Sequence, residues 1–334
     1  MRVVISAMRS NTFLTSIMPA HDLDILVTAP LPPFLYDPLK ADYRCHDYHQ
    51  AKDKPALLTQ QGQRVRGLVQ GGGTLTPTTL LNALPKLELI SVFGVGYDGV
   101  PVAYCKGRGI KVTNTPDVLT DDVADVAVGL ILMTGRGFVR ANRFVQAGEW
   151  EKRGPELTTK LSGRKVGILG LGRIGKAIAQ RVAAMGMKVA YTGRRPQQVP
   201  YEFVPSLKAL AAASDFLVVA CPGGDATRNI VNSDVLDALG KKGTLVNIAR
   251  GSIVDEPALV AALKAGTIKG AGLDVFVDEP HIPLELFTMD HVVLLPHVGS
   301  ATRETRQAMG DLCKANLDAY FSGKGVLTLI PELS

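Results

Sequence analysis

The chain has 334 residues, of which 46% are hydrophobic and 20% are charged, and its formal net charge is +6. This length favours two domains, and this composition is typical of a globular protein with a large core. The Lys and Arg residues are spread along the chain without a basic run, which argues against nucleic acid as a partner and favours small anionic ligands. The longest apolar stretch, residues 118–133, contains three aspartates, so no membrane partner is expected either.

The chain has four cysteines, with no CxxC pair and no histidine at metal-ligand spacing: Cys45, Cys105, Cys221 and Cys313. We therefore expect reduced, packed thiols, no metal site and a cytoplasmic location. Residues 1–21 precede the first predicted strand and are predicted to be an N-terminal extension. Their Arg, Ser and Thr content weakly resembles a transit peptide, but a plain extension is the favoured interpretation.

From Leu23 on, short apolar runs alternate with amphipathic segments, which is typical of a parallel sheet with crossover helices. The strands predicted in the first part are 24–28, 65–69, 89–92 and 111–114. Glycines follow the second of these strands and surround the third, at Gly71 to Gly73 and at Gly94, Gly96 and Gly99. Ligands of open α/β sheets bind at such strand ends, where glycine lets them approach the backbone.

The middle and last parts continue the pattern. Residues 121–148 are predicted to form one long helix, and residues 301–321 a final amphipathic helix. Between them, the predicted strands are 165–169, 188–191, 216–220, 244–248, 271–275 and 292–295.

The strand at 165–169 leads directly into a GxGxxG sequence, Gly170-Leu-Gly172-Arg173-Ile174-Gly175. A helix-like segment and a further strand follow, and this is the context that a dinucleotide-binding turn requires. Its glycines permit a tight turn and a close approach of pyrophosphate to the helix N-terminus. The alternative is a plain strand-to-helix turn, and the neighbouring elements favour the dinucleotide site.

The residues after the next strand distinguish the two nicotinamide cofactors. An NAD enzyme places Asp or Glu here, to bond the ribose 2′-hydroxyl. This chain has Gly193, Arg194 and Arg195 instead, with no acid before Glu202. Glycine leaves space for a 2′-phosphate that the guanidinium groups would bind, so we expect NADP, with NADPH preferred over NADH. An exposed basic turn is the alternative.

Three further predicted strands are followed by Arg250, Glu279 and His297. Each of these residues alone would more often be a surface charge or a core histidine. Because the carboxyl ends of parallel strands share one edge of a sheet, the three side chains are expected to converge on one crevice. Their joint position after a nucleotide-binding turn favours a catalytic site.

Together these segments resemble the D-isomer-specific 2-hydroxyacid dehydrogenase family, over nearly the whole chain from Asp22 on. The resemblance rests on Phe93-Gly-Val95-Gly96-Tyr-Asp, on Asp121-Asp-Val-Ala-Asp-Val-Ala, on the GxGxxG turn and on the three catalytic segments. The spacing of the three catalytic residues and the Thr-Gly-Arg-Arg turn are similar to those of its NADPH-using glyoxylate/hydroxypyruvate reductase branch.

The resemblance implies NADPH-dependent reduction of glyoxylate and hydroxypyruvate to glycolate and D-glycerate. His297 would donate the proton, Glu279 would hold its other ring nitrogen, and Arg250 would bind the keto acid. The substrate carboxylate would lie against the backbone around Gly72, Val95 and Gly96. The residues that would contact the cofactor are Gly170, Gly172, Arg173, Ile174, Gly175, Gly193, Arg194, Arg195, Ile248, Asp274 and Gly299.

The resemblance also implies the fold: two Rossmann-like or flavodoxin-like, doubly wound parallel-sheet domains with a cleft between them. Residues 22–115 and 300–334 would form the substrate-binding domain, and residues 116–299 the NADP-binding Rossmann domain, with hinges at the two crossings. A homodimer through residues 121–148 is expected. In it, Trp150 would either reach the partner's active site or anchor the interface.

Two alternatives stay open. A reductase of larger 2-keto acids, such as 2-ketogluconate or aromatic pyruvates, would use the same catalytic residues behind different pocket walls. A cofactor-sensing binding protein, similar to corepressors on this scaffold, could keep the same residues without turnover.

Overall fold

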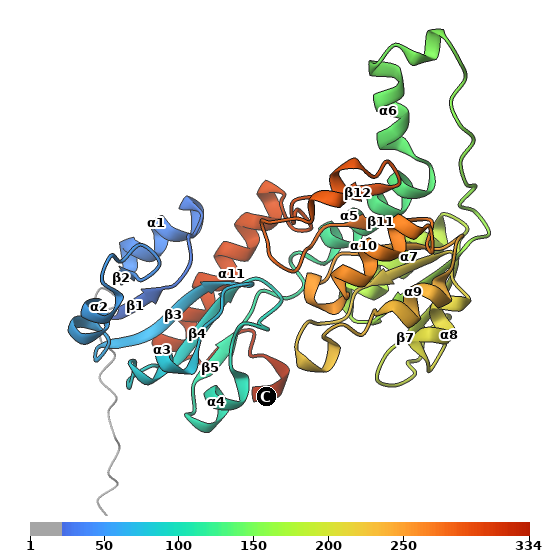
Figure 1. Ribbon diagram of the computed structural model, residues 1–334. Helices are drawn as coiled ribbons and strands as arrows, with labels where there is room; N and C mark the ends of the chain where they lie inside the picture. Colours follow the sequence, from blue (N-terminus) through green and yellow to red (C-terminus); the bar gives the residue numbers. More distant parts are fainter. Residues whose placement is uncertain (1–21) are drawn as a thin grey trace, which may run out of the picture.

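The computed structural model describes residues 22–334. They form two α/β units that lie side by side, each built on one parallel sheet (Figure 1). The predicted fold class, two doubly wound parallel-sheet domains, is therefore confirmed. The predicted N-terminal extension, residues 1–21, lies outside the described residues.

The first sheet has five parallel strands within the described chain, in the order β2-β1-β3-β4-β5, which is flavodoxin-like. Its strands are β1 (Asp24–Val27), β2 (Arg44–Asp47), β3 (Val65–Gly71), β4 (Leu89–Phe93) and β5 (Lys111–Thr113). The helices that connect them are α1 (Pro33–Asp42), α2 (Lys54–Gln61), α3 (Thr78–Asn82) and α4 (Val102–Gly107).

The second sheet has seven parallel strands among residues 22–334, in the order β12-β11-β10-β9-β6-β7-β8. Counted from β6, this is the Rossmann order with one further strand. The strands are β6 (Lys165–Leu169), β7 (Lys188–Thr192), β8 (Glu202–Phe203), β9 (Phe216–Val219), β10 (Thr244–Asn247), β11 (Gly270–Leu273) and β12 (Val292–Leu294). The helices between them are α7 (Arg173–Ala184), α8 (Leu207–Ala212), α9 (Ser233–Leu239) and α10 (Glu256–Ala265).

The central strands of both sheets are buried along their whole length, as in β1, β4, β9, β10 and β11. Helices cover both faces of such sheets, so the strands appear in the sequence as continuous apolar runs. This is why the ten strands predicted from the sequence are confirmed to within two residues. Strands β2 and β8 were not predicted.

The prediction of a single helix over 121–148 is wrong. Helix α5 (Thr120–Gly135) ends before Gly137, and α6 (Phe138–Gln146) begins after it. Gly137 has a φ of 60°, a left-handed conformation that glycine adopts without strain and that interrupts a helix. Helix α5 is buried along one side, whereas no residue of α6 is buried. Residues 138–160, which we call the arm, project away from the second unit (Figure 1).

Helix α11 (Arg303–Phe321) returns the chain to the first unit. The Ser91 hydroxyl in β4 donates a hydrogen bond to the carbonyl oxygen of Cys313 in α11, at 2.9 Å. Beyond the helix, Leu329 forms an antiparallel bridge with Thr113 of β5. The last helix is therefore part of the first unit, although the second unit lies between them in the sequence. No helix of the described chain is long and apolar enough to cross a membrane.

Candidate active site

The turn after β6 places three glycines between the strand and α7. Gly170 has a φ of 97°, and a Cβ on it would lie 2.7 Å from the backbone nitrogen of Cys221. A Cβ on Gly175 would lie 2.1 Å from the carbonyl oxygen of Gly170, so only glycine allows the helix to pack this close. A Cβ on Gly172 would meet no atom within 4 Å. The surface above the N-terminus of α7 is thus open, and it suits a pyrophosphate.

The turn after β7 carries the two arginines that were predicted to bind a 2′-phosphate. Arg194 and Arg195 are exposed, and a Cβ on Gly193 would meet nothing within 4 Å. Burial and the carboxylate of Glu332 raise the pKa of Tyr97, and the charge of Arg194 partly offsets them. The Tyr97 hydroxyl of the first unit donates to a carboxylate oxygen of Glu332 at 2.8 Å.

His297 and Glu279 form a pair. The Nδ1 atom of His297 lies 2.7 Å from Oε2 of Glu279, and Oε1 of Glu279 accepts a hydrogen bond from the backbone N–H of Phe276 at 3.0 Å. Burial pushes the pKa of Glu279 up, but these hydrogen bonds and the charges of His297 and Arg250 outweigh it, so the pKa lies below its ordinary value. Glu279 is an ionised acceptor, so Nδ1 carries the proton and Nε2 remains for a ligand.

Arg250 lies between the two units. Its Nε donates to Oδ1 of Asp98 at 3.1 Å, and its Nη1 donates to the carbonyl oxygen of Ala249 at 2.7 Å. Asp98 belongs to the loop after β4, and Arg250 follows β10. The charge of Arg250 is one of the causes that lower the pKa of Glu279, which is itself paired with His297.

Asp274, predicted to contact the cofactor, binds the loop that carries His297. Its Oδ1 and Oδ2 accept hydrogen bonds from the backbone N–H groups of Val298 and Gly299, both at 2.8 Å. Burial raises the pKa of Asp274 despite these bonds and the nearby charge of His297. Ile248, also predicted to contact the cofactor, is buried at the end of β10. Asp274 therefore fixes the backbone of the loop that carries His297.

The predicted substrate cradle is formed by two glycine-containing loops that touch. A Cβ on Gly72 would lie 3.0 Å from the carbonyl oxygen of Gly96, and one on Gly94 would lie 3.1 Å from the Cα of Gly72. The N–H of Gly72 donates to the carbonyl oxygen of Phe93 at 3.2 Å, so it is occupied within the protein. The N–H groups of Val95 and Gly96 donate to no other group of residues 22–334. Those two groups remain available for a carboxylate.

The sequence analysis did not assign roles to Asp98 and Gly223, although both contact Arg250. A Cβ on Gly223 would lie 2.9 Å from Cγ of Arg250. Asp98 belongs to the segment from Phe93 to Asp98 that carries part of the family resemblance, so the sequence contained a signal for it. The sequence contained no such signal for Gly223. Across the described residues, no three His, Cys, Asp or Glu side chains are grouped so that they could hold a metal ion.

Residues 128–299 match the family model described as "D-isomer specific 2-hydroxyacid dehydrogenase, NAD binding domain". Among similar proteins is a glyoxylate/hydroxypyruvate reductase A of Arabidopsis thaliana, 47% identical over 92% of this chain and 99% of that protein. A hydroxyphenylpyruvate reductase of Plectranthus scutellarioides is 46% identical, over 92% of this chain and 98% of the relative. A 2-ketogluconate reductase of Gluconobacter oxydans is 45% identical, over 91% of this chain and 97% of the relative.

A similar solved structure is that of the NADPH-dependent glyoxylate/hydroxypyruvate reductase of Sinorhizobium meliloti in complex with NADP and malonate. Its TM-score is 0.88 at 45% identity, over 93% of this chain and 98% of that chain. The similarity thus extends over both units and includes the segments that carry Arg250, Glu279 and His297.

Proposed function

The chain belongs to the D-isomer-specific 2-hydroxyacid dehydrogenase family, and from this we propose that it reduces glyoxylate and hydroxypyruvate to glycolate and D-glycerate with NADPH. It is an oxidoreductase with an NAD(P)-binding Rossmann domain. The observation that carries the proposal is the His297–Glu279 pair, with Nδ1 held at 2.7 Å beside Arg250. The similarity to the Arabidopsis and Sinorhizobium reductases supports these two substrates.

The glycine turn after β6 fits a dinucleotide, because a Cβ at Gly172 would meet nothing within 4 Å at the N-terminus of α7. Gly170, Arg173, Ile174 and Gly175 complete that cradle. When bound, the nicotinamide supplies the hydride. Gly193, Arg194 and Arg195 would hold a 2′-phosphate, which supports the preference for NADPH over NADH. Ile248, Asp274 and Gly299 would line the nicotinamide end.

His297 would act as the proton donor in reduction. Since Glu279 holds Nδ1–H, the proton to be transferred resides on Nε2, the nitrogen that remains for a ligand. The ionised carboxylate of Glu279 stabilises the doubly protonated ring before transfer. After transfer the ring is neutral and can be reprotonated from solvent, because the side chain is 45% exposed.

Arg250 would bind the keto oxygen and one carboxylate oxygen of the substrate. Its guanidinium carries a permanent charge, so it stabilises the negative charge that develops on the keto oxygen during reduction. The N–H groups of Val95 and Gly96 would bind the other carboxylate oxygen. A cradle of one cation and two amides suits a small monoanion.

The domain limits follow from the same proposal: residues 22–115 and 300–334 bind the substrate, and residues 116–299 bind NADP. Contacts of α11 with β4 support the return of the chain to the first unit. The loop with Val95 and Gly96 lies against Arg250, since a Cβ on Gly96 would lie 1.7 Å from Nη2, and the two crossings would act as hinges on either side of this contact.

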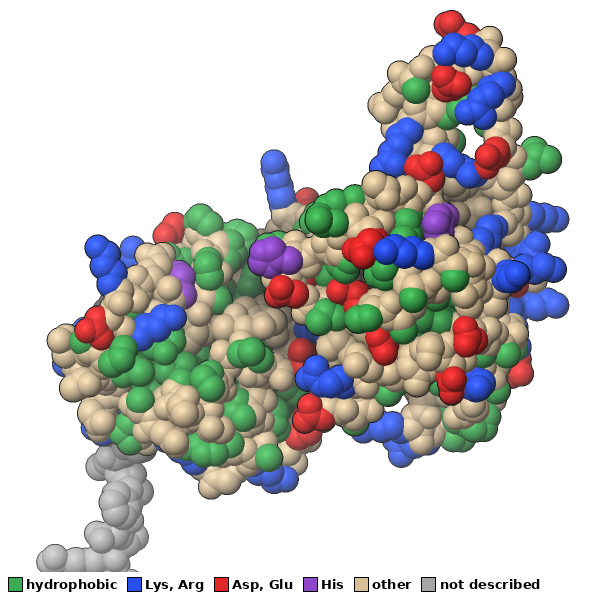
Figure 2. Space-filling view, in the orientation of Figure 1, with side chains coloured by type: hydrophobic (Ala, Val, Ile, Leu, Met, Phe, Trp, Pro, Cys, Tyr) green, Lys and Arg blue, Asp and Glu red, His purple; other side chains and the backbone are tan. Residues whose placement is uncertain are grey.

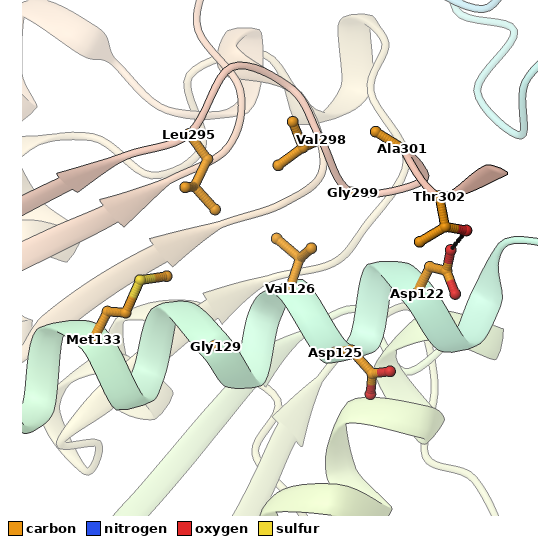
Figure 3. Close-up of a pocket in the computed structure, with 10 residues that line it drawn as sticks. All are labelled: Asp122, Asp125, Val126, Gly129, Met133, Leu295, Val298, Gly299, Ala301 and Thr302. Carbon is orange, nitrogen blue, oxygen red and sulfur yellow. Dashed lines mark hydrogen bonds between the residues drawn. The ribbon is translucent and has the colours of Figure 1, made fainter. Parts of the chain in front are cut away.

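We also propose a homodimer that forms through residues 121–148, and a cytoplasmic location. The arm supports the dimer, because it stands clear of the rest of the surface (Figure 2). Its residues Phe138, Val145 and Trp150 are exposed. An apolar pocket beside α5 supports it as well. Val126 and Met133 of the helix and Leu295 of the facing loop line that pocket (Figure 3). The four free cysteines support a reducing compartment.

The test is an initial-rate assay with NADPH and NADH on glyoxylate, hydroxypyruvate, 2-ketogluconate and hydroxyphenylpyruvate. We expect rapid NADPH oxidation with the first two acids and a loss of at least about 100-fold in His297→Ala. Turnover of only the larger acids would keep the mechanism and favour the activities of the Gluconobacter or Plectranthus relatives. Tight NADPH binding without any turnover would contradict the proposal and favour a cofactor-sensing protein.

A further inference from the structure

One ion pair at the site joins the two units. Asp98 lies in the loop after β4 of the first sheet, and Arg250 lies after β10 of the second. Oδ1 of Asp98 and Nε of Arg250 are 3.1 Å apart, and only 26% and 24% of the two side chains are exposed. A pair that is three-quarters buried is screened less by salt and water than a surface pair, so its geometry is held more firmly.

The remaining contacts of Arg250 leave one direction open. Nη1 donates to the carbonyl oxygen of Ala249, and Nε donates to Asp98. The side chain also packs against two glycines, because a Cβ on Gly96 would lie 1.7 Å from Nη2 and one on Gly223 would lie 2.9 Å from Cγ. The remaining N–H groups, two on Nη2 and one on Nη1, donate to no other group of residues 22–334. They are therefore available for an oxyanion.

We propose that Asp98 is a positioning residue for the reaction: it binds the Nε edge of Arg250 and thereby aims the Nη edge at the 2-keto acid. The inference rests on the proposed function and deepens it. Asp98 acts through Arg250 and does not touch the substrate. Because the two residues belong to different units, the guanidinium is oriented only when the glycine loop of the first unit lies against the second. Substrate binding by Arg250 is thus coupled to the placement of Val95 and Gly96, which precede Asp98 in the same loop.

A plain structural brace between the units is the competing explanation, and it makes different predictions. Loss of a brace would lower stability and weaken NADPH binding, and the loss would persist after Arg250 is changed. Loss of a positioning contact would affect the keto acid and spare NADPH. It would also disappear once the guanidinium is gone, because Asp98 would then have nothing to orient.

The experiment is a double-mutant cycle with Asp98→Ala and Arg250→Lys, in the full-length protein. Four quantities are measured: kcat and KM for glyoxylate, KM for NADPH, and the dissociation constant of malonate from the NADPH complex. We expect Asp98→Ala alone to lower kcat/KM for glyoxylate by about 10- to 100-fold and to weaken malonate binding by about 10-fold, with KM for NADPH changed by less than about 2-fold. Added to Arg250→Lys, the same change should cost less than about 2-fold more.

Two further variants refine the result. Asp98→Asn keeps an oxygen acceptor and loses the charge, so its effect should fall between those of wild type and Asp98→Ala. Asp225→Asn is the matched control, because its carboxylate is fully exposed two residues beyond Gly223 and, among residues 22–334, pairs only with Arg228, at 3.8 Å. It should leave all four quantities unchanged.

The outcomes separate this inference from the proposed function. If wild type turns over no keto acid while Asp98→Ala still weakens malonate binding, the positioning role stands and the proposed function falls. If wild type turns over glyoxylate while Asp98→Ala matches it in KM and in malonate binding, the positioning role is wrong. Equal losses from Asp98→Ala with and without Arg250→Lys would also overturn it, in favour of a brace.

Discussion

The backbone of His297 is held in an unusual conformation by its neighbours. Its φ of 54° lies in the left-handed region, which costs a residue with a Cβ about 1–3 kcal/mol. The two carboxylate oxygens of Asp274 accept the next two N–H groups, of Val298 and Gly299, and fix the turn that imposes this φ. Glu279 then fixes the ring. The carboxylate of Asp274 thus fixes the backbone conformation of His297, and the carboxylate of Glu279 fixes the orientation of its ring.

The carboxylate of Glu279 should contribute to reduction through its charge as well as by orienting the His297 ring. Glu279→Gln keeps an oxygen acceptor for Nδ1–H but removes the negative charge that stabilises the doubly protonated ring, so kcat/KM for glyoxylate at neutral pH should fall by about 10-fold or more. The pKa of Glu279 lies below its ordinary value, so the carboxylate is ionised at neutral pH and the variant removes a full charge.

Asp278→Asn is the control for that variant, because Asp278 is the exposed neighbour of Glu279 in the chain and its carboxylate pairs with His281. An unchanged kcat/KM in Glu279→Gln would show that Glu279 only orients the ring. The pair also stabilises the fold at neutral pH, and this contribution is lost as the pH falls through the lowered pKa of Glu279.

Substitutions of Arg194 and Arg195 test the proposed preference for NADPH over NADH. Arg194→Ala and Arg195→Ala should each raise KM for NADPH by about 10-fold, since a charge-assisted hydrogen bond to a phosphate contributes about 1.5–3 kcal/mol. KM for NADH should stay within about 2-fold, because NADH lacks the phosphate. Arg228→Ala, an exposed arginine of the same unit, serves as the control. An equal rise in both KM values would mean that the turn does not distinguish the cofactors.

For individual residues, the sequence predicted which residue types form the candidate site better than it predicted the contacts between them. Arg250, Glu279 and His297 follow β10, β11 and β12, which are neighbours in one sheet, so their convergence follows from parallel topology. The Asp98–Arg250 pair could not be predicted, because it depends on how two separate sheets are placed. The occupied N–H of Gly72 could not be predicted either, since its acceptor lies on an adjacent strand.

Two loops of the second unit, the one that carries Arg250 and the one that leads to Glu279, meet at Gly251. A Cβ there would lie 2.0 Å from the carbonyl carbon of Phe276 and 2.4 Å from the nitrogen of Val277. Gly251→Ala must therefore push the loop after β10 away from the loop that carries Glu279. We expect a loss of about 1–3 kcal/mol in the free energy of unfolding and a fall in kcat of at least about 10-fold.

Gly107→Ala is the matched change for that variant, because a Cβ at the end of α4 would meet nothing within 4 Å. It should leave kcat unchanged in an initial-rate assay and leave the unfolding free energy, measured in urea, unchanged or slightly higher. Full activity in Gly251→Ala would show that the two loops adjust independently.

The elements that the sequence missed lie at the edges of the sheets. β2 has the sequence Arg-Cys-His-Asp and is only partly buried, and β8 has two residues. Such strands carry no apolar run, because water replaces one neighbour, so periodicity cannot find them. The end of helix α5 before Gly137 was not predicted for the opposite reason, because here the apolar pattern extends beyond the element. Apolar residues continue past it into α6, where none of them is buried.

At the scale of the whole molecule, the exposed apolar residues of the arm predict how two copies of the protein associate. Val145 and Trp150 are 53% and 66% exposed on a segment that leaves its own unit. Val145→Glu combined with Trp150→Arg should convert the proposed dimer to a monomer at micromolar concentration, because charges would replace an apolar contact. Light scattering after size exclusion measures the mass. Leu327→Glu changes an equally exposed leucine of the first unit and should leave the mass unchanged.

The position of α11 has a consequence for how the protein is made. The strands of the first sheet leave the ribosome first, but the helix that covers β4 is translated only after the whole second unit. Until then, the face of β4 around Ser91 lacks Cys313, which later packs against it. The second unit can complete its core while one face of the first sheet is still uncovered. The first sheet is thus synthesised before the second but can reach its native packing only after it.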